Sequence, residues 1–188
     1  MEEQPNPHHL VLGELNDFLT GKIIADTLDE RFRQKIAKKL VYDCGFEKHE
    51  IKSNFKLEIR AGAKKALAKI DFLVEYRKKT IMMIKFAPGS LVTRRLASLA
   101  LSRIIQPYQI PFAVITNGEN AEIIDGYTGR VIAEGLDRLP DRNDVRAGLS
   151  GFSFDDIKKE VFNKASRIAY ACEIDGACAC DSDVCIIE

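Results

Sequence analysis

The sequence predicts an α/β (α+β) fold, and three observations lead to this class. The first is a helical apolar stripe near the N-terminus, which is followed by strands with alternating apolar residues. The second is a later helix that stands between two groups of strands. The third is the length of 188 residues, of which 46% are apolar and 30% charged, as expected for a soluble domain with its own core.

The first predicted helix covers residues 27–44, and Gly45 is a suitable C-cap. Its apolar stripe consists of Leu28, Phe32, Ile36 and Leu40. A half-buried strand is predicted over 53–61, with Phe55, Leu57 and Ile59 facing inward. The stretch 61–69, "AGAKKALAK", is predicted to be a small basic connector.

A hairpin of two strands is predicted over 70–86, with the turn "RKKT" between them and Pro88-Gly89 after them. In the first strand one face carries Ile70, Phe72, Val74 and Tyr76, and the other carries Asp71, Leu73 and Glu75. In the second strand a common face carries Ile81, Met83 and Lys85.

The rest of the chain predicts two helices and two strands. The helices lie over 90–108 and within 153–171, and the strands over 111–116 and 121–125 are separated by the turn "NGEN". In the helix 90–108 the residues expected to face inward are Val92, Leu96, Leu99 and Ile104. We expect a main domain over 1–150 and a C-terminal part over 151–188, made of a helix and a cysteine-rich tail.

The N-terminus, "MEEQPNPHHLVLG", has no basic segment followed by an apolar run, so no signal peptide is expected. No apolar stretch approaches the roughly 20 residues that a membrane-spanning helix needs. The expected location is therefore the cytoplasm.

The formal net charge is zero, but the charges are distributed unevenly along the chain. Residues 52–103 contain 13 basic and 3 acidic side chains, whereas residues 104–188 contain 8 basic and 15 acidic ones. The basic segment is suited to an anion such as nucleic-acid phosphate. The alternative is that its lysines merely solvate exposed strands and turns, with acidic residues elsewhere in the fold neutralising them.

The order helix, strand, hairpin, helix, strand resembles the N-terminal nuclease domain of type I restriction enzyme R subunits, in the PD-(D/E)XK superfamily. The stretches that carry the resemblance are "DERFRQKIAKKLVYDCGF", "KIDFLVEY", "IMMIKFAPG", "PFAVITNGENAEIID" and "GRVIAEGLDRLP". Each is short, and their order and spacing give the match its weight. The resemblance implies a restriction-endonuclease-like mixed β-sheet flanked by helices, with DNA as the partner.

The resemblance also implies a magnesium-dependent site made of one acid on the first helix, one on the first hairpin strand, and an acid-x-lysine on the second. The matching positions are Glu30, Asp71, Met83 and Lys85. Glu30 has an alternative role, because "TLDE" is a capping box in which it would bond back to the amide of Thr27. Asp71 and Lys85 are expected to pair with each other whether or not the site is active, since an acid and a lysine among apolar residues both need a partner.

Met83 stands where the pattern has an acid. A thioether is a poor ligand for magnesium, which selects oxygen, so cleavage is expected to be weak or absent. Glu75 and Glu58 are the alternatives for a migrated carboxylate. The family also places a Gln and a Tyr four residues apart on the helix after the lysine, whereas here Gln106 and Tyr108 flank Pro107.

Four of the five cysteines lie near the C-terminus: Cys172, Cys178, Cys180 and Cys185. Four thiolates could hold zinc or an iron–sulfur cluster, although the spacing C-x5-C-x-C-x4-C matches no standard signature. The alternative is a tail with free thiols. Cys44 is expected to be a core residue.

Three functions follow from these patterns. The first is a DNA-associated restriction-endonuclease-like domain with a degenerate site, in which Lys64, Lys65, Arg94 and Arg95 contact phosphate. The second is a non-enzymatic DNA-binding or assembly module, and the third is a thiolate-metal protein. The expected partners are DNA, a second copy of the chain, or the subunits of a restriction system.

Overall fold

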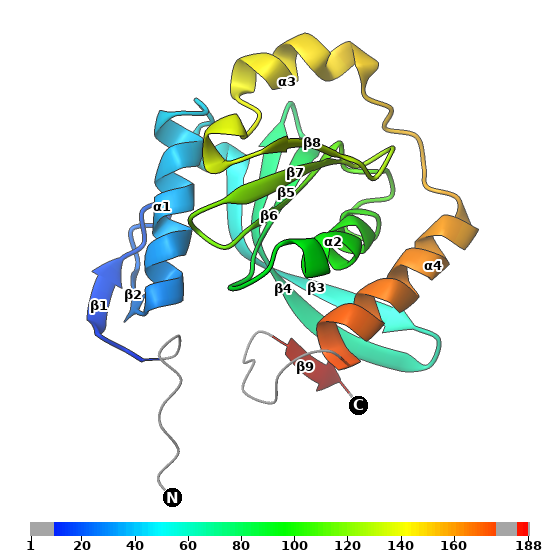
Figure 1. The fold of residues 1–188 in the computed structure, drawn as a ribbon, viewed down its shortest axis with the longest axis horizontal. Coiled ribbons are helices and arrows are strands. Elements are labelled where there is room, and N and C mark those ends of the chain that lie inside the picture. Colours follow the sequence, from blue (N-terminus) through cyan, green and yellow to red (C-terminus); the bar gives the residue numbers. More distant parts are fainter. Residues whose placement is uncertain (1–9, 176–183, 188) are drawn as a thin grey trace, which may run out of the picture.

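The structure is a computed structural model that describes residues 10–175 and 184–187 (Figure 1). The strands are β1 (Gly13–Asn16), β2 (Ile23–Asp26), β3 (Ile51–Ala61), β4 (Lys64–Tyr76), β5 (Lys79–Phe86), β6 (Phe112–Thr116), β7 (Ala121–Asp125), β8 (Val131–Glu134) and β9 (Val184–Ile187). The α-helices are α1 (Leu28–Tyr42), α2 (Arg95–Ser102), α3 (Arg142–Gly148) and α4 (Lys159–Tyr170). A π-helix (Ala171–Asp175) continues α4, and 3-10 turns lie at Lys48–Glu50, Val92–Arg94, Leu136–Arg138 and Leu149–Gly151.

The main sheet has the strand order β3-β4-β5-β6-β7-β8, and β9 pairs with β4. β5 and β6 are parallel, and the other neighbouring strands of this sheet are antiparallel. α2 lies in the connection between β5 and β6, as a parallel pair requires a crossover. The predicted α/β class is confirmed.

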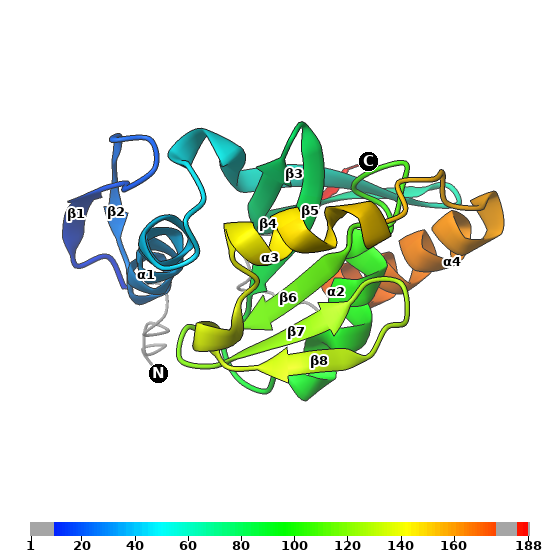
Figure 2. The ribbon, with the colours of Figure 1, turned by 90° about the horizontal axis from the view of Figure 1, so that it is seen from above.

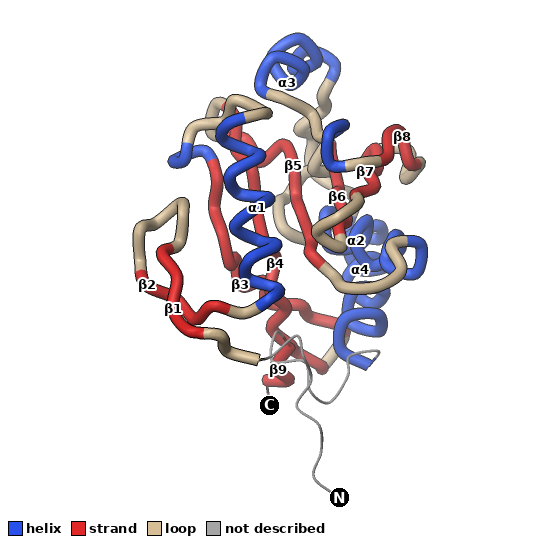
Figure 3. The backbone as a smooth tube through the Cα atoms, turned by 60° about the vertical axis from the view of Figure 1, so that its left-hand side comes forward, coloured by secondary structure: helices blue, strands red, loops and turns tan. Residues whose placement is uncertain are grey.

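The helices cover both faces of this sheet. On one face α1 and α3 contribute Ile36, Leu40 and Val145 to a core that includes Phe72 and Ile84. On the other face the core contains Leu101 and Ala113 together with residues of α4. Figure 3 shows α1 along the strands β3 and β4, with α2 and α4 close together elsewhere on the sheet. The hairpin β1–β2 stands apart beside α1, as Figure 2 shows.

α1 begins where the sequence predicts, because Thr27 is its N-cap and its hydroxyl accepts the N–H of Glu30. Ile36 and Leu40 of the predicted stripe are fully buried, whereas Leu28 at the start of the helix is exposed. Gly45 has a φ of 72°, the left-handed conformation that a residue just after a helix adopts and glycine favours.

The prediction of a connector over residues 61–69 was wrong. Residues from Lys64 onward belong to β4, which pairs with β3 from Ala61–Lys64 at the turn as far as Ile51–Val74. The long partner strand fixes these small and basic residues in an extended conformation, although their own β-propensity is low. Ala66 and Ala68 are buried under α4, while Lys64 and Lys65 are exposed.

The helix predicted over 90–108 is also shorter than expected. α2 has eight residues, and the chain leaves the helical conformation before Pro107, consistent with the restriction that proline imposes on the residue before it. Its buried face consists of Ala97, Ala100 and Leu101, so Val92 and Leu96, predicted to face inward, are exposed.

In the described part of the chain no helix combines the length and the apolar composition that crossing a membrane would need.

Candidate active site

Asp71 lies at a break in the pairing of β4. The β3–β4 ladder pairs Ser53 with Phe72 and Phe55 with Ile70 but passes over Asn54, which has a φ of 54°. On the other side, the β4–β5 ladder ends at the pair Phe72–Ile84. Neither ladder includes a pair at Asp71, so the pairing of β4 is interrupted at this residue.

This break changes the faces of the strand. The sequence pattern places Ile70 and Phe72 on one face, but Ile70 packs in the core under α4 and Phe72 in the core under α1. The strict alternation predicted for residues 70–76 was therefore wrong at Asp71.

Both carboxylate oxygens of Asp71 are engaged, and its side chain is 2% exposed. Arg33 of α1 donates its Nε to Oδ1 at 2.7 Å, and the backbone N–H of Phe86 donates to Oδ2 at 2.6 Å. The Phe86 contact joins the end of β5 to β4 at the point where their ladder has stopped. The predicted partner of Asp71 was Lys85, and the structure places Arg33 there instead.

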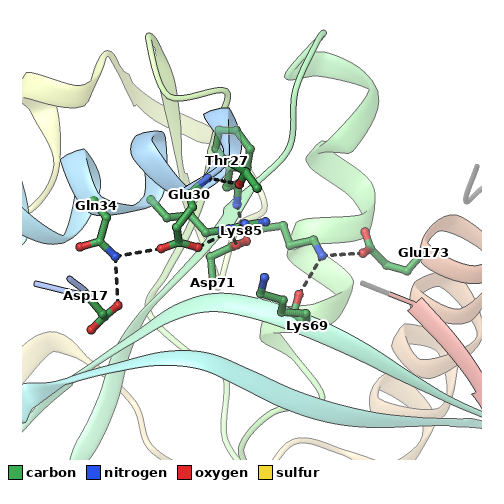
Figure 4. Close-up of polar contacts among 10 residues, drawn as sticks. Asp17, Thr27, Glu30, Gln34, Lys69, Asp71, Lys85 and Glu173 are labelled. Carbon is green, nitrogen blue, oxygen red and sulfur yellow. Dashed lines mark hydrogen bonds and ion pairs between the residues drawn. The ribbon is translucent and has the colours of Figure 1, made fainter. Parts of the chain in front are cut away.

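Glu30 lies on the same side of α1, one turn before Arg33 (Figure 4). Its Oε2 lies 3.7 Å from Nη1 of Arg33, and its Oε1 accepts Nε2 of Gln34 at 2.8 Å. Only its backbone N–H takes part in the Thr27 cap. The carboxylate is therefore directed to Arg33 and Gln34, and Arg33 contacts both acids that the resemblance singles out.

Gln34 extends this network to the N-terminal hairpin. Its Nε2 also donates to Oδ2 of Asp17 at 3.0 Å, and its Oε1 accepts the N–H of Phe18 at 2.7 Å. Burial by itself would raise the pKa of Asp17, but hydrogen bonds from Thr20 and Gln34 bring that pKa below its ordinary value. Asp17 is thus held as a carboxylate at the end of a chain of polar contacts that leads to Asp71.

Lys85 takes different partners. Its ammonium donates to the carbonyl of Lys69 at 2.8 Å and lies 3.1 Å from Oε2 of Glu173 in the π-helix. The side chains of Lys85 and Glu173 are 13% and 5% exposed. Figure 4 shows Lys85 reaching past Asp71 toward Lys69 and Glu173.

Met83 lies inside the core. Its side chain is 0% exposed, its cross-strand neighbour is Leu73, and it belongs to the core shared with α2 and α4. It has the same strand face as Lys85, but it is packed among apolar side chains.

The two alternative acids are occupied elsewhere. Glu75 lies 2.5 Å from Nζ of Lys52, and Glu58 pairs with Arg60. Among the residues that the structure describes, no three His, Cys, Asp or Glu side chains gather in a way that could hold a metal ion. The site as described offers Glu30 and Asp71 with an arginine between them.

Gln106 and Tyr108 hold the opposite end of β5. Gln106 donates to the hydroxyl of Thr80 at 3.0 Å, and the Tyr108 hydroxyl accepts the N–H of Thr80 at 2.9 Å. Thr80 lies at the start of the strand and Lys85 near its end. These two residues therefore anchor the strand and lie away from Asp71.

The four predicted phosphate contacts differ in their surroundings. Lys64 and Lys65 are exposed at the turn end of the β3–β4 hairpin, and Arg94 is half-buried beside α2. Arg95 makes a two-point ion pair with Glu122, at 2.5 Å from Nε and 2.7 Å from Nη2. Its guanidinium is already satisfied by a carboxylate.

The cysteine cluster falls mostly outside the described residues. Cys178 and Cys180 lie there, and of Cys185 only the backbone, in β9, is described. Cys172 is a half-buried free thiol whose pKa is raised by burial and by the neighbouring Glu173. Cys44 is buried in the core under α1, and burial raises its pKa to about 11.

Sequence reasoning missed Arg33, Gln34 and Glu173. Arg33 and Gln34 follow Glu30 by three and four residues, and this helical spacing could have indicated that all three share a face. Glu173 gave no signal, because only the tertiary fold brings it to Lys85.

Comparison with known proteins gives one family and one curated relative. The family model described as type I restriction enzyme R protein N terminus (HSDR_N) matches residues 28–140. Glutamate–tRNA ligase 2 of Rickettsia massiliae (strain Mtu5) is 30% identical over 174 residues, which cover 88% of this chain and 31% of the ligase. The chain thus corresponds to about a third of that protein. No solved structure matches it.

Proposed function

The chain belongs to the family of type I restriction enzyme R protein N-terminal domains, and on this premise we propose that it is a DNA-associated domain with weak or no magnesium-dependent cleavage. Its mixed sheet, with helices on both faces, is the restriction-endonuclease-like architecture that the sequence resemblance implied. The ligase activity in the relative's name is not part of this proposal, since the likeness covers 31% of that protein.

The observation that carries the proposal is the position of Arg33. Its guanidinium lies 2.7 Å from Oδ1 of Asp71 and 3.7 Å from Oε2 of Glu30, so a cation already neutralises both acids. Magnesium needs free carboxylate oxygens in a strict octahedral arrangement. The other oxygen of Asp71 accepts the N–H of Phe86, so both oxygens already take part in hydrogen bonds.

Met83 supports the same conclusion. In the pattern that the resemblance implies, position 83 supplies an oxygen ligand for magnesium, and a buried thioether in an apolar core cannot supply one. The residues present do not fit the metal, so we derive no catalytic step through it. In this reading Arg33, Asp71 and Phe86 serve to fix α1 and β5 to the broken stretch of β4.

DNA association is supported by charge and exposure. The exposed Lys64 and Lys65 extend from the hairpin end of a segment with a net charge of +10. Such lysines can bind phosphates of either strand without base contacts, and that binding weakens as salt rises. The other subunits of a restriction system are the protein partners we propose.

A plasmid assay tests the cleavage part of the proposal. Supercoiled plasmid is incubated with the full chain and with Asp71→Ala, in magnesium and in manganese. We expect no more nicking by the natural chain than by the variant. Strong magnesium-dependent cleavage that Asp71→Ala abolishes would show that the metal displaces Arg33, and the degenerate-site proposal would fail.

A further inference from the structure

The contact between Lys85 and Glu173 joins the sheet to a segment far along the chain. Glu173 lies in the π-helix that follows α4, and its carboxylate is almost fully buried against the ammonium of Lys85. A carboxylate and a phosphate offer an ammonium the same kind of anionic oxygen at the same distance. Glu173 therefore offers Lys85 the same kind of charged oxygen that a DNA phosphate carries.

The segment that carries Glu173 is held in a second place. β9 pairs antiparallel with β4, from Lys65–Ile187 to Ala68–Val184. This pairing ends next to Lys69, whose carbonyl also accepts the Lys85 ammonium. The π-helix and β9, here called the C-terminal cover, thus lie over the lysine and along the edge of β4 that leads to Asp71.

The local structure of the cover is suited to opening. A π-helix is rare, occurs mostly as a single turn within or at the end of an α-helix, and is frequent at functional sites. β9 contributes only four residues to its ladder. In the DNA complex a phosphate would take the place of Glu173, so Lys85 has an anionic partner both in the closed form and in the complex.

We propose that the C-terminal cover is an autoinhibitory device in which Glu173 mimics a DNA phosphate and must leave before Lys85 can bind DNA. This rests on the proposed DNA association. It adds that the affinity for duplex DNA is set in part by an equilibrium between closed and open forms of the cover, which DNA shifts by binding the open form.

The first test compares two variants, each of which replaces one buried glutamate by glutamine and so removes one negative charge. Binding is measured by fluorescence anisotropy with a labelled DNA duplex at fixed salt. Glu173→Gln keeps the size of the side chain and removes the competing charge, so we expect about tenfold tighter binding, the value of one charge-assisted contact. Glu50→Gln is the matched control. Glu50 is also buried and ion-paired, at 3.1 Å from Arg142, but it does not contact Lys85. We expect its affinity to stay within about twofold of the natural chain, because Glu50 pairs with Arg142 and not with Lys85.

A double variant tests the role of the lysine. In Lys85→Gln/Glu173→Gln the phosphate contact is lost, so the tenfold gain should disappear. A gain that persists without Lys85 would show that Glu173 acts through general charge repulsion, and the phosphate-mimic proposal would be wrong.

The second test uses the natural chain and does not depend on the folding of a variant. Hydrogen exchange is followed with and without the duplex, and we expect amides of 171–175 and 184–187 to exchange faster in the complex. If DNA binds but these amides stay equally protected and Glu173→Gln binds no tighter, autoinhibition is refuted while the proposed DNA association stands. If neither the natural chain nor Glu173→Gln binds the duplex, the proposed DNA association fails and autoinhibition fails with it.

Discussion

Arg33 is a partner that both acids of the candidate site share. It is 11% exposed and contacts Asp71 and Glu30, and its guanidinium also lies 5.4 Å from the ring of Phe86. A planar, permanently charged group with several donors is suited to such multiple contacts, which a lysine could not reproduce. The two acids therefore form part of a structural network at the break in β4.

This role predicts a strong energetic coupling between Arg33 and Asp71. Arg33→Met should lower the free energy of unfolding by about 3 kcal/mol, because it leaves Asp71 buried with only the Phe86 amide. Asp71→Asn in addition should restore part of that loss, since the uncompensated charge is then gone. Urea unfolding of both single variants and the double variant measures the coupling. Additive effects would mean that the pair does not stabilise the fold.

Met83 gives a second prediction at this scale. Met83→Glu places a carboxylate in an apolar core opposite Leu73, so we expect a loss of about 3 kcal/mol or more in unfolding free energy. Met83→Leu is the matched control and should cost less than about 1.5 kcal/mol. The plasmid assay is then repeated with the folded fraction of Met83→Glu. If Met83→Glu unfolds at the same urea concentration as the control, its carboxylate has reached a cation or solvent, and the core position assigned to residue 83 would need revision.

Asp17 predicts how stability depends on pH. Its pKa in the folded chain is lowered below the ordinary 3.8, so its contribution to stability is fully present above that value. The contribution is lost as the pH falls through the lower, folded pKa, where the carboxylate is protonated. Asp17→Asn should therefore differ most from the natural chain near neutral pH and least in acid. Urea midpoints measured across this pH range check the prediction, and a difference that is constant with pH would contradict it.

At the scale of elements, local sequence patterns predicted the helices and strands whose apolar residues recur with a regular period. The first helix, the hairpin of β4 and β5, and the strands β6 and β7 all follow from apolar spacing and turn residues. The stretch "AGAKKALAK" did not, because its extension depends on pairing with β3 and burial under α4. The break at Asp71 was equally hidden, since it arises from the ladders on both sides of β4 and from the left-handed Asn54. β9 pairs with a strand more than one hundred residues away, a contact that no local pattern encodes.

In the basic segment, residues 52–103, the structure gives different surroundings to cations that the sequence does not distinguish, so we predict different roles for them. Lys64 and Lys65 are exposed, so replacing both by Gln should weaken duplex binding and reduce the salt slope by about 2, near 0.9 for each phosphate contact. Arg95→Gln should leave the slope nearly unchanged but lower the thermal midpoint, because Glu122 is buried and would lose its two-point partner.

Anisotropy titrations at several salt concentrations separate these outcomes. Arg94→Gln, in the 3-10 turn directly before Arg95, serves as a comparison. A slope that falls as much for Arg95→Gln as for the lysine pair would mean that Arg95 leaves Glu122 and binds phosphate.

At the scale of the whole molecule, the fold brings the basic and acidic parts of the sequence together. Acidic residues from beyond residue 104 pair with cations of the basic segment, as Glu122 does with Arg95 and Glu173 with Lys85. Part of the charge balance of the chain is therefore made by direct ion pairs between the two parts of the sequence. The hairpin end with Lys64 and Lys65 is exposed, so phosphate attraction is expected there.

The C-terminal cysteines give the last prediction, which concerns the same segment as the cover. Cys172 precedes Glu173 directly, and both burial and that carboxylate raise its thiol pKa, so it is protonated unless a metal compensates. A tetrahedral zinc or an iron–sulfur cluster would supply that compensation and hold Cys172 as a thiolate.

We expect chain purified without oxygen to contain about one zinc ion or one cluster per chain, and Cys178→Ser/Cys180→Ser to lose it. Cys44→Ala is the matched control, because Cys44 lies in the core under α1 and should not affect metal content. Elemental analysis and the visible spectrum decide between zinc, a cluster and neither. Metal content that the double substitution leaves unchanged would show that these thiols are not its ligands.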